Sequence, residues 1–355
     1  MAFSLRKKLK YALSKCEAMI VNGKKNTEDL PTLYLDQDEM KYVQHTKYIG
    51  DVFQENGKND ELIKDRVNRG IRAMLKIEAI LSETSFGKHT IDVSLLLYRA
   101  LFLSTILFNS QSWRNLTEKN ITQLQSLQLR LLKKLVNAPS STSSSFIFLE
   151  LGVLPIRYEI HQRQLTFLHH IVNLDETDPV YCLYQNMKRL PGEKNWYNDV
   201  LRTSTIYGID IDEDRLKSIS KELFKTTVKS SIRQFAFDDL TTQCASQSKT
   251  CDLKYSSFQT QPYLSKLYPS QGKTILKCRA KCLKIKTHRP FQFPNKVCRW
   301  CNLEDESLAH IVNCGWEEKM DLTNIQDLMD IDIEKEAKLV SLATRVNHFL
   351  ELVDF

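Results

Sequence analysis

Four residues near the C-terminus have the types and spacing of a metal-binding site. Cys298 and Cys301 are separated by two residues, and His310 and Cys314 by three, in the pattern C-x2-C-x8-H-x3-C. A two-residue gap allows both sulfurs to face one ion, and residues four apart lie on one face of a helix. The sequence therefore predicts a tetrahedral Zn²⁺ site. Because such a site has no open coordination position, we do not expect a catalytic metal.

The residues around these ligands predict a tight knuckle followed by a short helix. Asn302 tolerates the left-handed backbone that a knuckle needs, and Ser307 is expected to cap a helix over residues 308–314. The zinc could be purely structural, or the knuckle could touch nucleic acid, although the acids at 304–306 would repel phosphates. A further interpretation leaves the four side chains as unlinked thiol and imidazole groups.

Positive charge is concentrated just before these ligands. Between Leu253 and Leu303 the chain has eleven Lys or Arg and no Asp or Glu, whereas its total net charge is only +7. Cations that neutralise phosphates release counterions, so we expect salt-dependent binding of RNA or single-stranded DNA. A helix over residues 274–286 would align four of the lysines in a stripe. The candidate contacts are Lys273, Lys277, Arg279, Lys281, Lys284, Lys286, Arg289, Lys296 and Arg299.

Aromatic residues are interleaved with these cations. Exposed rings stack on unpaired bases for roughly 1 to 3 kcal/mol per base. About half of these aromatics are expected in the core, and the preferred stacking candidates are Phe291, Phe293 and Trp300. A second basic group, on a predicted helix over 59–81, could bind nucleic acid or be an ordinary solvated face. It consists of Arg66, Arg69, Arg72 and Lys76.

The composition is that of a helical globular protein. Among 355 residues, Gly (10) and Pro (9) are scarce, so few residues interrupt long helices. The basic N-terminus has no apolar segment of signal-peptide length behind it, and the apolar stretch 94–108 is too short to cross a bilayer. Nine cysteines, an odd number, fit a reducing compartment. We therefore expect an intracellular protein, in the nucleus or cytoplasm, without membrane contact.

Hydrophobic periodicity predicts a mainly α fold with a small α+β N-terminal part. An amphipathic helix carrying Leu5, Leu9 and Leu13 precedes three expected strands, at 17–21, 32–35 and 41–49. Residues 140–145 are expected to be a Ser/Thr linker, and residues 246–261 to be irregular. Helices are predicted over 59–81, 92–110, 118–137, 155–173, 179–187, 195–207, 212–237, 274–286 and 333–353. Thr117 is the expected cap of the helix over 118–137, and the last helix is expected to pack over the C-terminal module.

Several segments, in this order, resemble non-LTR (LINE-type) retrotransposon reverse transcriptases downstream of their catalytic motif. KCEAMIV (15–21) looks like the motif after the active site, KYIGDVF (47–53) like the primer-grip hairpin, and residues 59–81 like the first thumb helix. Residues 149–174 are similar to a stretch behind the thumb. Residues 262–289 and the knuckle resemble the C-terminal end of these polyproteins.

The resemblance implies four parts: a palm-end and primer-grip-like segment (1–57), a thumb-like bundle (58–139), a helical connection region (140–252) and a basic zinc-knuckle module with a C-terminal helix (253–355). Two features depart from the family. Its knuckle commonly has four residues between His and the last Cys, where this chain has three. The aspartates that hold its catalytic Mg²⁺ ions lie upstream of the first matched segment, so this chain lacks them.

Three functional hypotheses follow. The first is a catalytically incomplete fragment or descendant of such a reverse transcriptase that binds RNA or single-stranded nucleic acid through its basic CCHC module, with no enzymatic activity. The second is an all-helical protein-interaction scaffold in which zinc is purely structural. The third is part of an RNA-directed DNA polymerase that is active only with a palm supplied elsewhere.

Overall fold

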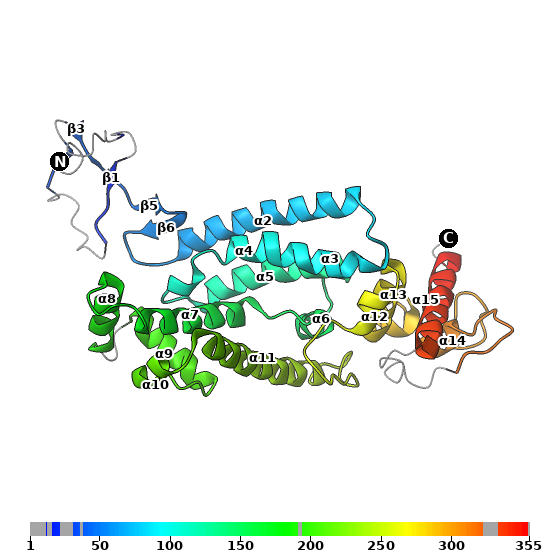
Figure 1. The fold of residues 1–355 in the computed structure, drawn as a ribbon. Coiled ribbons are helices and arrows are strands. Elements are labelled where there is room, and N and C mark those ends of the chain that lie inside the picture. Colours follow the sequence, from blue (N-terminus) through cyan, green and yellow to red (C-terminus); the bar gives the residue numbers. More distant parts are fainter. Residues whose placement is uncertain are drawn as a thin grey trace.

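The computed structural model describes residues 12, 16–21, 31–35, 38–190, 194–321 and 333–353. These residues form an elongated, mostly helical molecule with small strand pairs at one end and the basic segment with the last helix at the other (Figure 1). The predicted mainly α fold with a small β-containing N-terminal part is confirmed. The helix expected around Leu5, Leu9 and Leu13 lies outside the described residues.

The strands are short and pair locally. Within the described residues, β1 pairs in parallel with β4, and β2–β3 and β5–β6 are antiparallel. Ile49 and Gly50, between β5 and β6, both have positive φ, as a two-residue hairpin turn of type I′ requires. The bounds are β1 Glu17–Ala18, β2 Tyr34–Leu35, β3 Asp38–Glu39, β4 Lys41–Tyr42, β5 His45–Tyr48 and β6 Asp51–Gln54.

A bundle of three helical segments follows the hairpin. The middle segment contains a π-helical turn, so the helix predicted over 92–110 is not continuous. Gly70 allows the segments to approach, because a Cβ there would lie 2.7 Å from both Ile106 and Leu127. The segments are α2 (Asp60–Glu83); then η3 (Gly87–His89), α3 (Thr90–Leu97), the π-helix η4 (Tyr98–Leu103), α4 (Ser104–Ile106) and η5 (Ser110–Ser112); then α5 (Glu118–Leu135), capped by Thr117 as predicted.

Arg66 fastens the β5–β6 hairpin to this bundle. Its guanidinium is fully buried, pairs with Asp51 and donates to the carbonyl of Gly50 at 3.1 Å. It also lies 5.2 Å from the ring centroid of Phe108. Because this side chain is buried and its guanidinium pairs with Asp51, it cannot reach a phosphate. The predicted nucleic-acid contact of Arg66 is therefore corrected to a structural role.

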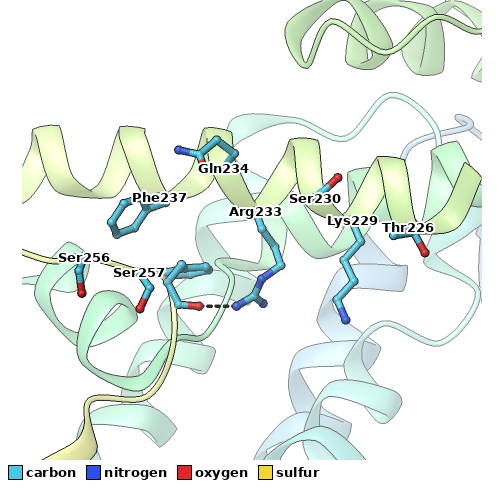
Figure 2. A pocket seen from close by; sticks show the side chains of 9 residues that line it. Thr226, Lys229, Ser230, Arg233, Gln234, Phe237, Ser256 and Ser257 are labelled. Atoms are coloured by element: carbon cyan, nitrogen blue, oxygen red, sulfur yellow. Dashed lines mark hydrogen bonds between the residues drawn. The ribbon is translucent and has the colours of Figure 1, made fainter. Parts of the chain in front are cut away.

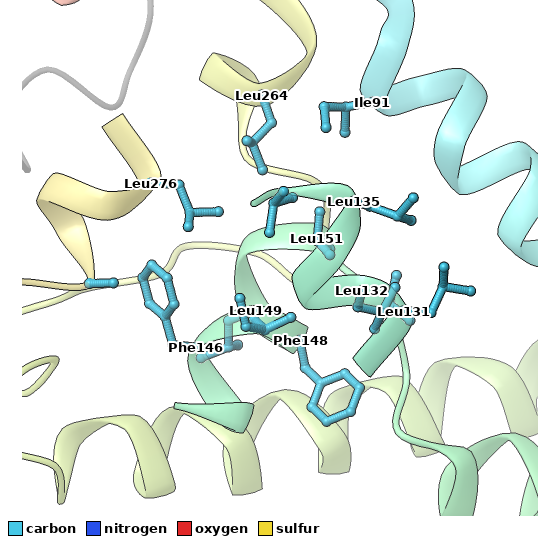
Figure 3. Close-up of a cluster of buried hydrophobic side chains, with 14 of the residues drawn as sticks. Ile91, Leu131, Leu132, Leu135, Phe146, Phe148, Leu149, Leu151, Leu264 and Leu276 are labelled. Carbon is cyan, nitrogen blue, oxygen red and sulfur yellow. The ribbon is translucent and has the colours of Figure 1, made fainter. Parts of the chain in front are cut away.

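Helix α6 (Ser144–Leu151) lies at the centre of the main core (Figure 3). Seven of its eight residues are buried, as expected for a helix that is apolar on all sides. Phe146 and Leu149 face α13, while Leu151 lies between Leu135 of α5 and Leu264 of α12. The expected linker at 140–145 is thus partly wrong, because its last two residues open α6 and Ser143 caps the helix.

A second core is built by the helices that follow. Leu165, Leu168, Val228 and Ile232 are fully buried at its centre. The helix predicted over 212–237 is in fact two helices that break at 219–220, the second of which runs eight residues beyond the predicted end. The helices are α7 (Ile156–Val172), α8 (Pro179–Lys188), α9 (Trp196–Ile206), α10 (Glu213–Ser218) and α11 (Lys221–Ala245).

The C-terminal elements pack back on the main core. The helix predicted over 274–286 ends instead at Arg279, and Lys281 has a left-handed φ of 46°. The expected lysine stripe is therefore broken, since Lys281 and Lys284 lie beyond the helix. The last helix has the predicted bounds. The elements are α12 (Pro262–Lys266), α13 (Pro269–Arg279), η6 (Lys286–His288), α14 (Leu308–Ile311) and α15 (Ile333–Val353).

A fully buried ion pair joins α6 to α13. Arg279 donates from Nε and Nη2 to Glu150 Oε1 at 3.0 and 2.8 Å. Tyr255 Oη donates to the same oxygen at 2.7 Å, and Tyr263 Oη donates to Oε2 at 2.5 Å. Burial and the Glu150 charge hold the pKa of both tyrosines well above its usual range, so they remain donors. Arg279 is therefore also corrected from a nucleic-acid contact to a core residue.

The main core contains residues from both sides of two predicted boundaries. One buried cluster includes side chains of α2, α5, α6, α13 and α15, and so crosses 139/140 and 252/253. The division into four parts stays a prediction from the resemblance. Among the described helices, none combines the length and the apolar character needed to span a bilayer.

Gly152 is the point where the chain after α6 crosses a distant segment. Its φ is +60°, and a Cβ there would lie 2.4 to 2.6 Å from backbone atoms of Gln259 and Thr260. Thr260 forms an antiparallel bridge with Leu151 at this crossing. Any side chain at 152 would therefore have to displace backbone.

We expect Gly152→Ala to lower the free energy of unfolding by at least about 3 kcal/mol, since it adds a backbone clash to a left-handed conformation. Gly208→Ala is the matched control, because Gly208 has a similar φ of +61° with open space around it. That variant should lose only about 1 to 2 kcal/mol. Denaturant titration measures both values, and equal losses would show that the crossing imposes no steric constraint.

Candidate metal centre and the surrounding basic surface

The four predicted ligands converge. Cys298 Sγ lies 3.9 Å from Cys314 Sγ, and Cys301 Sγ lies 3.3 Å from His310 Nε2. All four ligand atoms lie within 4.8 Å of one another. An ion with bonds of about 2.0 to 2.3 Å places tetrahedral ligands roughly 3.5 to 3.8 Å apart. The geometry therefore fits a four-coordinate metal ion.

The knuckle loop contains the left-handed residue that was predicted from the sequence. Asn302 has a φ of 57°, and its N–H donates to the carbonyl of Cys298 at 3.1 Å. The N–H groups of Trp300 and Leu303 point at the sulfurs of Cys298 and Cys301, at 3.4 and 3.5 Å. These backbone dipoles stabilise thiolates. The hydrogen bond from the Leu303 N–H is the largest contribution that lowers the pKa of Cys301 to about 6.

The histidine ligand comes from α14. Ser307 accepts a hydrogen bond from the His310 N–H at 3.2 Å, which confirms the predicted cap, although the helix ends at Ile311, earlier than expected. His310 Nδ1 lies 3.1 Å from Glu304 Oε2, so Nε2 is left to face the sulfurs. A carboxylate on the outer nitrogen orients the ring and raises its basicity, as is common for ligand histidines.

Glu306 anchors the knuckle rather than repelling phosphates. It is fully buried and accepts hydrogen bonds from Arg299 Nε and Nη2 at 3.0 and 2.7 Å, and from the backbone N–H of Arg299 and of Lys286. Burial would raise the pKa of Glu306, but these hydrogen bonds outweigh it and lower the pKa. The negative charge expected for this loop is thus partly neutralised by Arg299, which belongs to the same loop.

Helix α15 holds the loop that carries the four candidate ligands against the core. This loop, residues 298–318, is called the metal-binding loop. Arg345 Nη1 donates to the carbonyls of Val312 and Glu318 at 3.1 and 2.9 Å, and its guanidinium lies 4.8 Å from the ring centroid of Trp316. Thr274 of α13 donates to Asn347 Oδ1 at 2.8 Å. The predicted packing of this helix over the C-terminal module is confirmed.

The predicted cations of the basic segment differ in how far internal contacts occupy them. Arg279 is buried with Glu150, Arg299 is bound to Glu306, and Lys286 Nζ donates to the carbonyl of Val297 at 2.7 Å. Lys281 pairs with the exposed Asp252 at 2.8 Å. Arg289 donates to Gln292, a neutral partner, and Lys284 is exposed.

Three of the predicted cations have no acidic partner among the described residues: Lys273, Lys277 and Lys296. Lys296 is exposed, and Lys273 and Lys277 are half-buried on α13. Burial, together with the charge of Lys277, lowers the pKa of Lys273. Neither lysine has an acidic partner among the described residues, so the positive charge on this helix is not balanced by a nearby carboxylate. An anion would balance it.

The three aromatic candidates differ in exposure. Phe291 is fully exposed and Trp300 is half-exposed, so both rings are available for stacking. Phe293 is half-buried beneath the guanidinium of Arg299, whose carbon lies 5.5 Å from its ring centroid. Tyr255 and Tyr263, which hold Glu150, illustrate the share of aromatics that was expected in the core.

On the thumb-like helix α2, three of the four predicted cations remain at the surface. Arg72 and Lys76 are exposed, whereas Arg69 is half-buried and pairs with Asp65 at 2.7 Å. Only Arg66 is buried, as described above. Arg72 and Lys76 are therefore accessible to an anion. Their helix, α2, lies apart from α14 (Figure 1).

Several pockets lined by cations were not identified from the sequence, and two of them involve residues near the basic segment. One, of about 440 Å³, lies between α11 and residues 256–258; Lys229 and Arg233 project into it, and Arg233 donates to the carbonyl of Phe258 (Figure 2). The other, of about 590 Å³, contains Lys249 and His288. Isolated cations such as Lys229 and Lys249 give no sequence signal, because their neighbours come from distant elements.

Comparison with models of known protein families, with curated proteins and with solved structures finds no match for this chain. The similarity to non-LTR reverse transcriptases therefore depends on the sequence segments alone.

Glu304→Gln should weaken the affinity for added Zn²⁺ about 10- to 100-fold, because the ring of His310 loses the carboxylate that orients it. Asp305→Asn is the matched control, since it removes the same charge from the adjacent exposed residue. Competition with a chromophoric chelator measures both affinities. An equal loss in the two variants would mean that Glu304 acts only through long-range charge.

Proposed function

We propose that this chain is a nucleic-acid-binding protein whose basic C-terminal module, built around a Zn²⁺ ion, binds RNA or single-stranded DNA. The observation that carries the proposal is that Lys249, Lys277 and Lys296, in or just before the basic segment, have no acidic partner among the described residues, and that Lys249 lines one pocket with Phe291. Two exposed aromatic rings, those of Phe291 and Trp300, accompany these cations. Cations beside exposed aromatic rings are the combination that single-strand binders use.

The choice of zinc follows from the donor set. Three sulfurs and one imidazole nitrogen at tetrahedral spacing are typical of structural zinc sites, and soft thiolates disfavour Mg²⁺ and Ca²⁺. Zn²⁺ bound there would supply folding free energy and no open coordination position. Cys298, Cys301, His310 and Cys314 would hold it, and Glu304 would orient the histidine.

We further propose that the chain is a catalytically incomplete relative of a LINE-type reverse transcriptase. The segments that resemble the primer grip and the thumb correspond to a hairpin and a long helix that are fastened together by Arg66. The resemblance implies that the catalytic aspartates of the family lie upstream of the first matched segment. A polymerase that becomes active when a palm is supplied elsewhere is the related alternative, and polymerase activity of the purified chain alone would refute the non-enzymatic proposal.

A protein-interaction scaffold is a second candidate, favoured by one observation. Val180 and Leu183 project from α8 into solvent, and Leu190 is exposed just after the helix. Exposed apolar side chains that cluster on one element often mark protein-protein contacts. In this alternative the zinc only holds the C-terminal fold together, and the chain ignores nucleic acid.

Zinc removal should unfold the metal-binding loop and release α15. We expect one Zn²⁺ per chain by metal analysis, and we expect Cys298→Ser to lose the ion and to become sensitive to protease after residue 291. Structural zinc contributes on the order of 10 kcal/mol to small knuckles. Cys251→Ser, at an exposed cysteine outside the cluster, is the control and should behave like the wild type. Unchanged protease resistance in Cys298→Ser would contradict a structural ion.

Binding of a short single-stranded oligonucleotide should fall steeply with salt. Each phosphate that is neutralised on a single strand contributes a slope of about −0.7 in log K against log salt concentration. The combined variant Lys277→Gln and Lys296→Gln should therefore flatten the slope by about 1.4 without changing the melting temperature. Filter binding over a salt series measures this. Absence of binding by the wild type at low salt would favour the scaffold.

A further inference from the structure

The pocket that contains Lys249 and His288 lies where three distant segments meet. Ser141 comes from the turn between α5 and α6, Lys249 from the turn after α11, and the remaining wall from residues 281–292. Its volume of about 590 Å³ is within the range of small-ligand sites. Because its walls come from separate parts of the fold, the pocket is a product of the tertiary structure and not of one basic loop.

The lining of this pocket is cationic. Lys249, Lys281 and Arg289 contribute three positive charges, and among the described residues no Asp or Glu lines it. Lys281 pairs with Asp252, but that carboxylate is largely exposed, so a phosphate can compete for the lysine at little cost. Arg289 is held by Gln292, a neutral partner that leaves its charge uncompensated.

Two half-buried groups in the wall, His288 and Cys282, lie near these cations. Burial, and then the charges of Lys249 and Lys281, lower the pKa of His288 to about 4, so this imidazole is neutral at pH 7. Burial raises the pKa of the Cys282 thiol, while a hydrogen bond with Thr142 and then the charges of Lys277, Lys249 and Arg289 oppose that rise. Lys249, Lys281 and Arg289 therefore line the same hollow as His288 and Cys282.

Phe291 stands at the rim with its ring fully exposed. The N–H groups of Gln292 and Phe293 both donate to the carbonyl of Arg289, at 3.0 and 3.1 Å, and this turn presents the ring at its tip. Phe293, by contrast, is covered by Arg299. An exposed aromatic ring beside a cationic hollow matches the two faces of a nucleotide, an apolar base and an anionic phosphate.

We propose that this pocket holds one nucleotide of an unpaired strand, with its phosphate against Lys249, Lys281 and Arg289 and its base stacked on Phe291. The inference rests on the proposed nucleic-acid binding and adds to it a location, a stoichiometry and a residue, Lys249, that lies outside the basic segment 253–303. A paired base cannot offer its face to Phe291, so the site selects single strands over duplexes.

The test compares oligothymidylate of about twelve nucleotides with an abasic strand of the same length, by fluorescence anisotropy on the full chain. Phe291→Ala should raise the Kd for oligothymidylate about tenfold and leave the Kd for the abasic strand unchanged, because only the base stacks. Lys249→Gln should flatten the salt dependence by about 0.7 on both strands. Lys225→Gln, an exposed lysine of α11 that does not line the pocket, is the matched control and should bind like the wild type.

The possible failures are distinguishable. If the wild type ignores both strands at low salt, the proposed function fails and the pocket assignment fails with it. If the wild type binds but the Phe291 and Lys249 variants bind as it does, nucleic-acid binding stands and the pocket assignment is wrong. An equal loss on both strands for Phe291→Ala would overturn the stacking contact.

Discussion

One buried ion pair constrains the rest of the molecule. Removing Glu150 and Arg279 from water costs several kcal/mol for each ion, and only a complete set of partners compensates for it. Tyr255 and Tyr263 complete that set by donating to the carboxylate, so four side chains from α6, α13 and the segment between α11 and α13 must meet in one arrangement. Loss of one partner would leave a buried charge unpaired. The position of α13 relative to α6 is therefore fixed.

The position of α13 in turn determines where the basic surface lies. The helix ends at Arg279, and the left-handed turn at Lys281 sends the chain toward η6 and the metal-binding loop. There Glu306 joins the backbone at 286–287 to Arg299, between the first two cysteines. A series of hydrogen bonds around Glu306 thus joins the chain that leaves α13 to the metal-binding loop. The cations that remain at the surface are those this series does not use.

Features that depend on neighbouring residues in the sequence were predicted well, whereas ion pairs between residues far apart in the sequence could not be predicted. The cap at Thr117, the left-handed Asn302 and the ligand set follow from residue type and spacing, and the structure has all three. Arg66 and Arg279 were assigned to phosphates because a count of charges treats every cation as exposed. Their acidic partners lie 15 and 129 residues away in the sequence, and no local pattern reveals such pairs.

Helix α6 has a consequence for the order in which the chain folds during synthesis. Its side chains are buried against α12 and α13, which the ribosome produces more than a hundred residues later. α5 and α11 also pack on α6, but the side that faces α12 and α13 has no partner until those helices emerge, and closing so long a loop slows its burial. Part of the apolar surface of α6 therefore stays exposed until the C-terminal third of the protein has been synthesised.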